Sequence, residues 1–399
     1  MSCGCWPQHT TGSYAKEVRE TGVRRVTRIL VSGLTDNPGG VETVVLRYLT
    51  HFPEDIRFDV WVSAERCAFE DDLKAAGCGV FHGRRYSKGL AAARRDMEDF
   101  FKERGSDYDV LWSNKSMLVN PDDLRLARRA GIKRRILHAH NSRAMFPGAR
   151  GLAKAALHRA NRLRVPGLAT DYWACSDGAG YYFFTPSVRR SPGFRTVRNA
   201  LDPGRYRFDP TRRAAVRCAL GIEESVPTVG FVGRLQYQKN PQFLIEAFGA
   251  YNRTDPSSVL LVAGDGDLRA ECEQMSNLAG LDSAVRFLGV RNDVEELYQA
   301  FDLLLLPSRF EGLSVAAIEA QAAGLPVIAS DTVPRETAVT ELMRFLPVDH
   351  GAEEWVSQMA ELLRQRDGRA DITVDLAARG YDIEVEAERL ASVLTGVVL

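Results

Sequence analysis

Residues 303–326 read LLLLPSRFEGLSVAAIEAQAAGLP, which predicts a strand, a short loop and a short helix. The apolar run 303–306 is typical of a buried strand. Ser314 is a good helix N-cap, and Gly324 lies where a helix would stop. Because ligands of open α/β sheets bind at the carboxyl ends of strands, the loop between this strand and this helix is a candidate binding site.

Two carboxylates flank the predicted start of this helix. Glu311 lies on the loop, and Glu319 follows eight positions later, on the helix. Two carboxylates at such a place can hold sugar hydroxyls while the backbone N–H groups of the helix N-terminus hold phosphate. The combination suits a nucleotide-sugar.

Strand-like apolar runs alternate with helix-like stretches along the rest of the chain. This alternation predicts an α/β fold whose parallel sheets are covered on both faces, in two facing, Rossmann-like, doubly wound domains. The expected strands are 26–32, 58–62, 80–82, 110–112, 135–138, 172–175, 195–197, 228–232, 259–263, 285–288, 303–306, 327–329 and 344–346.

The expected division of the chain has a linker near 198–203. We expect a flexible extension at 1–24, an acceptor-binding N-terminal domain at 25–199 and a nucleotide-sugar-binding C-terminal domain at 200–383. A last helix, 384–399, would return to the N-terminal domain.

Bulk composition is that of an ordinary globular enzyme, with 399 residues, 45% hydrophobic residues and a formal net charge of zero. No stretch is apolar enough to predict a membrane span, and the first residues predict no signal peptide. Seven scattered cysteines favour reduced thiols and a cytoplasmic location. Cys3 and Cys5 with His9 could form a metal tract, but an uninformative N-terminus is favoured.

A glycine and two cations follow the predicted strand 228–232. Arg234 and Lys239 lie between this strand and a helix that Asn240 and Pro241 would open as N-cap and first residue. Two cations there can clamp a diphosphate and neutralise the charge on a leaving group. The alternative, two solvated loop residues, is disfavoured by the glutamate loop in the same half.

Two further loops of the second half are candidates for contact with a nucleotide. Gly264 and Gly266 alternate with Asp265 and Asp267, and the aspartates could hold a divalent metal. We favour a glycine turn that lets the backbone approach a ligand, since two cations already supply positive charge. The loop at Val290 and Arg291 could lie along a nucleobase or form a plain connection.

In the first half, Gly39 and Gly40 open a helix, where adjacent glycines allow close approach to phosphate or sugar. His138 and His140 follow at the end of the strand that begins at Arg135. One of them is expected to reach the crevice, and both share a face if the strand continues to His140. The alternative for each is a structural imidazole.

The region 124–170 contains twelve Lys or Arg and no Asp or Glu. Within it, 145–170 resembles a basic amphipathic helix. It could dock on an anionic membrane surface or hold an acidic acceptor, or it could be a solvated basic face. Nucleic acid is disfavoured because no reading motif is present and aromatic residues are not interleaved with the basic ones.

Together these residues resemble the retaining glycosyltransferases of family 4, which have the two-domain GT-B fold. The strongest parts are Arg234 with Lys239, the glycine pair Gly264 and Gly266, and the two glutamates with seven residues between them. Gly39 to Glu42, Phe69 with Glu70, and His140 with Asn141 are similar to the branch that makes capsular or exopolysaccharide units. One departure is Lys239-Asn240, where the family has lysine and glycine; we expect the helix cap to be kept.

The resemblance implies a role for each candidate. Arg234 and Lys239 would bind the donor diphosphate, with Gly40 near the phosphate. Glu311 would contact the sugar hydroxyls beside the backbone of Gly312, Leu313 and Ser314, and His140 would lie near the reacting sugar. Glu319 would hold the ribose, and Val290 and Arg291 would contact the base. The family usually requires neither a cofactor nor a metal.

The expected reaction moves a hexose from a nucleotide donor, in the first place a UDP-sugar, to a hydroxyl of a lipid-linked or saccharide acceptor, with retention of configuration. The enzyme would act in the cytoplasm, at the inner face of the membrane. Two alternatives stay open, since fold does not fix function. One is a sugar-nucleotide epimerase or phosphorylase, and the other is a silent scaffold of a polysaccharide assembly complex.

Overall fold

The computed structural model describes residues 26–144, 148–365 and 368–396. The predictions for 1–24, including Cys3, Cys5 and His9, and for Met145 concern residues outside the described ranges. Its strands are β1 (Thr27–Ser32), β2 (Ile56–Val62), β3 (Gly79–His82), β4 (Val110–Lys115), β5 (Arg134–Ala139), β6 (Asp171–Ala174), β7 (Phe194–Thr196), β8 (Thr228–Val232), β9 (Val259–Ala263), β10 (Val285–Gly289), β11 (Leu303–Leu306), β12 (Val327–Ser330) and β13 (Met343–Leu346).

Helices separate the strands along the chain. They are α2 (Gly40–His51), α3 (Glu70–Ala75), α4 (Leu90–Arg104), α5 (Asp122–Arg129), α6 (Gly148–Arg164), α7 (Asp177–Phe183), α8 (Pro186–Arg189), α9 (Pro203–Tyr206), α10 (Pro210–Ala219), α11 (Pro241–Asn252), α12 (Arg269–Leu278), α13 (Val294–Ala300), α14 (Val315–Ala322), α15 (Glu353–Arg364), α16 (Thr373–Ala378) and α17 (Ile383–Thr395). Among the described residues, none of these helices is long and apolar enough to cross a membrane.

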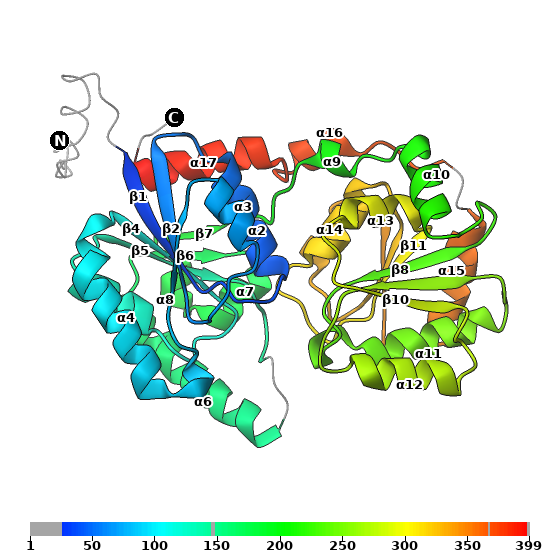
Figure 1. The fold of residues 1–399 in the computed structure, drawn as a ribbon, viewed down its shortest axis with the longest axis horizontal. Coiled ribbons are helices and arrows are strands. Elements are labelled where there is room, and N and C mark those ends of the chain that lie inside the picture. Colours follow the sequence, from blue (N-terminus) through cyan, green and yellow to red (C-terminus); the bar gives the residue numbers. More distant parts are fainter. Residues whose placement is uncertain (1–25, 145–147, 366–367, 397–399) are drawn as a thin grey trace, which may run out of the picture.

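The strands form two parallel sheets that lie side by side (Figure 1). One has the order β3-β2-β1-β4-β5-β6-β7 and the other the order β10-β9-β8-β11-β12-β13. Each order reverses beside its first strand, β1 or β8, which is where ligands bind in doubly wound sheets. The fold class predicted from the alternating sequence pattern is therefore confirmed.

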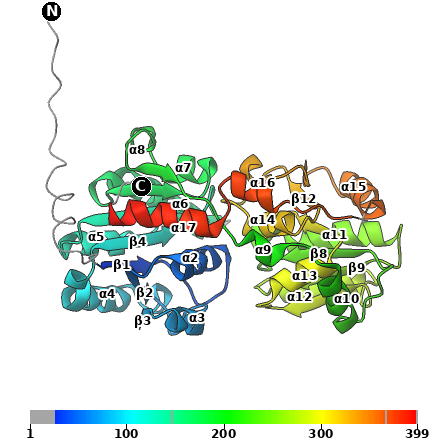
Figure 2. The same ribbon diagram turned by 90° about the horizontal axis from the view of Figure 1, so that it is seen from above.

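Apolar strand residues build the core between these sheets and their helices. The run Leu303 to Leu306 has at most 1% of its surface exposed, as its composition predicts. Helix α17 returns to the first sheet, where Ile383 and Leu390 share a buried cluster with Ile29 of β1 (Figure 2). The expectation of a returning last helix is confirmed.

The chain passes between the two sheets at two places that are hydrogen-bonded to each other. The N–H group of Leu201 donates to the carbonyl of Tyr381 at 3.0 Å, and the N–H group of Ile383 donates to the carbonyl of Leu201 at 2.9 Å. The two crossings therefore lie next to each other.

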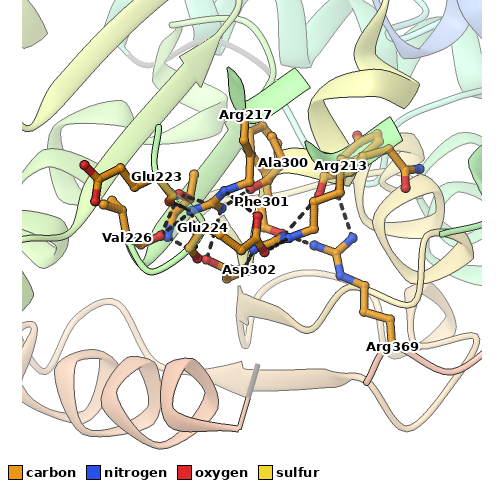
Figure 3. A network of polar contacts seen from close by, with 12 residues as sticks. Arg213, Arg217, Glu223, Glu224, Val226, Ala300, Phe301, Asp302 and Arg369 are labelled. Atoms are coloured by element: carbon orange, nitrogen blue, oxygen red, sulfur yellow. Dashed lines mark hydrogen bonds and ion pairs between the residues drawn. The ribbon is translucent and has the colours of Figure 1, made fainter. Parts of the chain in front are cut away.

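Three arginines complete the carboxyl end of α13 (Figure 3). Helix ends leave their last carbonyls without helical partners. Here Arg369 donates to the carbonyl of Tyr298, Arg213 to that of Gln299 and Arg217 to that of Ala300. Asp302 lies within 3.5 Å of two of these arginines and balances part of their charge. The network fixes α13, whose Tyr298 side chain reaches the site described next.

Candidate active site

A cavity of about 840 Å³ lies between the two halves of the chain. Both halves contribute to its lining, as the sequence predicts for a ligand at the carboxyl ends of the strands. It is lined by these sequence-predicted residues: Gly40, His140, Arg234, Lys239, Gly264, Gly266, Val290, Arg291, Glu311, Gly312, Leu313 and Glu319. Ser314 does not line it. The Ser314 hydroxyl instead caps α14 by accepting a hydrogen bond from the N–H group of Ala317.

The Glu311 carboxylate is buried and held from three sides. The Lys239 ammonium lies 2.6 Å from Oε1, and the Ser308 hydroxyl donates to the same oxygen at 2.7 Å. The Gln238 amide donates to Oε2 at 3.2 Å. The sequence analysis places Lys239 at the diphosphate and Glu311 at the sugar. In the structure the two side chains form one ion pair.

Arg234 extends from the loop after β8 toward the other half of the chain. A Cβ atom placed on Gly39 would lie 3.6 Å from the Arg234 guanidinium carbon, so the guanidinium lies against the start of α2. Among the described residues the guanidinium of Arg234 makes no hydrogen bond or ion pair. A cation that lines the cavity without a partner is available to an anionic ligand.

Asn240 stands at the N-cap position of α11 and Pro241 opens the helix, as the sequence predicts, but the expected capping by the Asn240 side chain is absent. Its side chain makes no capping hydrogen bond, and its backbone is left-handed, with φ of 53°. Glycine and asparagine are the residues that tolerate this conformation best. The asparagine that departs from the family's glycine thus keeps the backbone turn after Lys239 rather than a cap.

Gly264 and Gly266 let two loops of the second half come together. A Cβ atom on Gly264 would lie 2.0 Å from the carbonyl oxygen of Gly233, and one on Gly266 would lie 2.4 Å from that of Leu235. The glycine turn favoured from the sequence is therefore required by the approach of the Arg234 loop. Asp265 accepts hydrogen bonds from the N–H group of Gly266 and from Arg269.

Glu319 is buried, and its partners come from both halves. Arg47 of α2 forms an ion pair with Oε1, and the hydroxyls of Tyr206 and Tyr298 donate at 3.1 Å and 2.9 Å. Burial raises the pKa of both tyrosines, so they stay protonated and donate. Burial alone would lower the pKa of Arg47, but the Glu319 charge beside it raises that pKa.

His138 and His140 lie on one face of the sheet, with ring centroids 4.0 Å apart, and only His140 lines the cavity. The Asn114 amide nitrogen donates to the carbonyls of Ser32 and Trp112, which leaves its oxygen to accept from Nε2 of His140 at 2.8 Å. Nε2 therefore carries the proton and Nδ1 is an acceptor. Burial lowers the pKa of His140 to about 3, so the ring is neutral near pH 7.

The remaining predicted residues lie at the edges of the cavity. A Cβ atom on Gly40 would lie 3.3 Å from Val315 of α14, so α2 and α14 meet there. Val290 is 56% exposed, and Arg291 pairs with Asp293 at 2.7 Å. These two residues form the outer rim of the second half.

Comparison with known proteins agrees with this geometry. A family model described as "Glycosyl transferases group 1" matches residues 226–365. EpsF of Bacillus subtilis (strain 168), named as an inferred glycosyltransferase, is 29% identical over 93% of this chain and 96% of its own. Both matches are to glycosyltransferases, and the family model covers most of the second half of the chain. The predicted family is confirmed, and the protein is an enzyme that transfers a sugar.

Other relatives of this glycosyltransferase match in part or in fold. D-inositol 3-phosphate glycosyltransferase of Saccharomonospora viridis is 35% identical, over 44% of this chain and 43% of its own. The crystal structure of HepE of Anabaena in complex with UDP and glucose is similar with a TM-score of 0.75, 20% identity and coverage of 93% of this chain and all of that one. The glycosyltransferase thus has the GT-B fold.

Sequence reasoning missed several residues of the glycosyltransferase site. Arg47, Tyr206 and Tyr298 hold Glu319, yet no motif marks them, and they are far apart in the chain. Asn199 was assigned only to the linker, but it lines the cavity. The sequence analysis names Phe69 only as part of the resemblance to the family. It also lines the cavity, in a left-handed backbone conformation with φ of 56°.

Carbonyl groups of the glutamate loop, residues 311–314, also have partners in the first half of the glycosyltransferase. Side chains that follow three neighbouring strands of the first sheet bind them. The donors are Ser142 to the carbonyl of Glu311, Ser176 to that of Gly312 at 2.6 Å and Asn199 to that of Leu313 at 3.1 Å. The loop is therefore fixed across the cavity.

Proposed function

We propose that this glycosyltransferase moves a hexose, with retention of configuration, from a UDP-sugar to a hydroxyl of a lipid-linked or saccharide acceptor in polysaccharide biosynthesis. The observation that carries the proposal is the guanidinium of Arg234, which has no ion-pair partner in the described part of the chain and lines the same cavity as the ion pair of Lys239 and Glu311. Such a group of charges suits a ligand with a diphosphate and sugar hydroxyls.

The donor half of the proposal keeps the division of roles that the resemblance implies. We assign the donor to 200–383 and the acceptor to 25–199 with the returning helix 384–399. Arg234 would bind the diphosphate, and Val290 and Arg291 at the rim would contact the base. The UDP bound in HepE and the name of EpsF support this donor and this pathway.

We assign Glu319 to the ribose of the donor, because one of its carboxylate oxygens can accept a further hydrogen bond. Oε1 already accepts from Arg47 and Tyr206, whereas Oε2 accepts only from Tyr298 among the described residues. A carboxylate oxygen accepts two hydrogen bonds, so Oε2 has room for one ribose hydroxyl. The tyrosines and Arg47 would hold the carboxylate in that orientation.

The wall from the first half suits a saccharide acceptor. Phe69 offers an aromatic surface, and Asp72, Thr43 and Ser116 offer polar groups for hydroxyls. A bulky residue at positive φ is strained, and such strain is typical of functional sites. Because His140 is neutral, its side chain places no charge at this wall. The leaving phosphate itself would take the acceptor proton, as in the family mechanism.

Helix α6 supports the proposed location at an anionic membrane surface. Leu152 and Leu163 are 74% and 73% exposed, and they lie on one helical face with the exposed alanines 149, 153, 156 and 160. The buried face is polar: His158 and Asn161 bind backbone groups near residue 118. An apolar stripe toward solvent beside the basic residues 150, 159 and 164 is the arrangement of a helix lying in a membrane interface.

Vesicle binding tests this location. We expect the protein to sediment with vesicles of anionic phosphatidylglycerol and not with neutral phosphatidylcholine. Replacing Leu152 and Leu163 by asparagine should weaken this binding at least about fivefold, because apolar area is lost from the interface. Leu278→Asn is the matched control, since Leu278 is 82% exposed on α12 of the other half. Equal binding by all three proteins would refute the membrane role.

Turnover with a panel of UDP-sugars tests the central proposal. Glu311→Ala and Lys239→Ala should abolish transfer while the fold stays intact by circular dichroism. Glu103→Ala and Lys102→Ala, two exposed residues of α4, are the matched controls. The anomeric proton of the product should show the configuration of the donor by NMR. Near-normal turnover by both cavity variants would contradict the proposed glycosyltransferase site. Formation of an isomerised UDP-sugar in the absence of acceptor would favour an epimerase.

A further inference from the structure

The hydrogen bonds that fix the glutamate loop come from one edge of the first sheet. Strands β5, β6 and β7 are neighbours in that sheet. Ser142 follows β5, Ser176 follows β6 and Asn199 follows β7. We call these three residues the carbonyl donors, because each donates to one of three consecutive carbonyls of the loop.

Three consecutive carbonyls with partners on one side are not a strand pattern, because strand carbonyls alternate in direction. The peptide unit is planar and trans, so the N–H group of each unit points away from its carbonyl. The N–H groups of Gly312, Leu313 and Ser314 therefore face away from the first half. They have no hydrogen-bond partner in the described part of the chain. These unpaired donors lie just before α14, where the helix dipole also favours an anion.

Close contact at this place depends on Gly312. A Cβ atom on Gly312 would lie 2.1 Å from the carbonyl oxygen of His140. The loop therefore touches the end of β5 directly, and the contact exists only while the two halves are close together. The side chain of Asn199 is a second indication that the contact has a functional role. Its amide oxygen is buried and has no hydrogen-bond partner among the residues that the structure describes, while its nitrogen binds the loop. A buried unpaired acceptor is costly, so this arrangement is poor for stability alone.

We propose that Ser142, Ser176 and Asn199 are positioning residues that couple closure of the two halves to the orientation of the glutamate loop. The inference rests on the proposed function. When the halves close, the carbonyl donors fix the loop, its N–H groups point toward the donor diphosphate, and Glu311 takes its place beside Lys239. When the halves open, the loop loses three partners at once. The nucleotide stays on the second half in both states.

The variants that test this proposal differ in one hydrogen bond each. Ser142→Ala removes the donor to Glu311, and Ser142→Thr keeps it. Asn199→Asp replaces a donor with a carboxylate that repels the carbonyl of Leu313. Ser176→Ala removes the donor to Gly312 but also the N-cap of α7, where Ser176 accepts from Ala179. Thr185→Ala is its control, because Thr185 caps α8 and does not touch the loop.

The expected result is a split between rate and binding. Ser142→Ala and Asn199→Asp should each lower kcat about tenfold. A change of this size corresponds to the loss of one hydrogen bond that stabilises the transition state. Ser142→Thr should restore kcat to within about threefold. The Kd for UDP, measured by titration calorimetry, should change less than about threefold in each variant. Thr185→Ala should lower the melting temperature through its lost cap but leave kcat unchanged.

Small-angle scattering gives a readout that does not need turnover. With UDP bound, the radius of gyration should be larger for Ser142→Ala and Asn199→Asp than for the unaltered enzyme, because fewer molecules are closed. An unchanged kcat in both variants of an active enzyme would overturn the proposal. If no UDP-sugar is turned over, the proposed function fails instead. Identical scattering of the variants and the unaltered protein would then overturn the coupling on its own.

Discussion

The ammonium nitrogen of Lys239 lies 2.6 Å from Oε1 of Glu311, and both side chains line the cavity between the halves. The lysine thus neutralises a buried carboxylate before any donor binds. A diphosphate would share this cation with the glutamate, so the positions of sugar and phosphate depend on each other. The first prediction follows from this pair.

Lys239→Ala and Glu311→Gln should each lower kcat/KM about a hundredfold or more, since each removes a group placed for the transition state. The double variant should be little worse than either single variant, because residues that act as a unit are not additive. Steady-state kinetics of the four proteins measure this coupling. Multiplication of the two single effects would show that Lys239 and Glu311 act independently.

Arg47→Ala should lower the free energy of unfolding by about 3 kcal/mol, because it leaves the buried Glu319 carboxylate without its cation. Urea unfolding measures this change. Arg344→Ala is the control: Arg344 pairs with Glu361 in a more exposed ion pair, whose loss should cost less than about 1 kcal/mol. A similar loss in both variants would mean that Arg47 does not compensate a buried charge.

Gly264→Ala should weaken UDP binding at least about tenfold, because the new methyl group would collide with the carbonyl oxygen of Gly233 and displace the loop that carries Arg234. Gly280→Ala provides the control for backbone strain. Gly280 also has a positive φ, of 69°, but a Cβ atom there meets no neighbour within 4 Å. Gly280→Ala should lose some stability and keep UDP affinity. Equal affinity for UDP in both variants would show that the close contact of Gly264 with Gly233 is not needed for UDP binding.

His140 predicts a dependence of stability on pH. Its pKa falls from an ordinary 6.5 to about 3 through burial, so the unfolded chain binds a proton between these values and the folded chain does not. The stability is therefore complete above pH 6.5 and is lost as the pH falls toward 3. Between pH 7 and pH 5, the protein should lose about 2 kcal/mol relative to His140→Gln in urea unfolding. Parallel pH curves for the two proteins would contradict a neutral, buried imidazole.

The fold was predictable because its strands are strongly apolar. The run 303–306 is fully buried, and every strand expected from the sequence has a counterpart in the two sheets. Helix boundaries such as Ser314 and Gly324 were also readable, since capping and left-handed glycine are local properties. Local sequence features are therefore enough to predict these helix boundaries.

The site was predictable only where a motif is contiguous. Arg47 binds Glu319 across a separation of 272 residues, and no local pattern marks such a pair. Asn240 shows a different limit: its position before Pro241 predicts a cap, but the turn after Lys239 requires a left-handed backbone. The carbonyl donors were missed because serine and asparagine after a strand are ordinary loop residues until the fold brings them to residues 311–314.

Titration calorimetry with UDP and UDP-sugars tests the central claim most directly. The account predicts saturable binding of one nucleotide per chain, at least about tenfold weaker in Arg234→Ala and unchanged in Arg364→Ala, a variant of an exposed arginine on α15. Absence of nucleotide binding, or equal affinity in both variants, would contradict the claim that the cavity between the two halves is a nucleotide-sugar site.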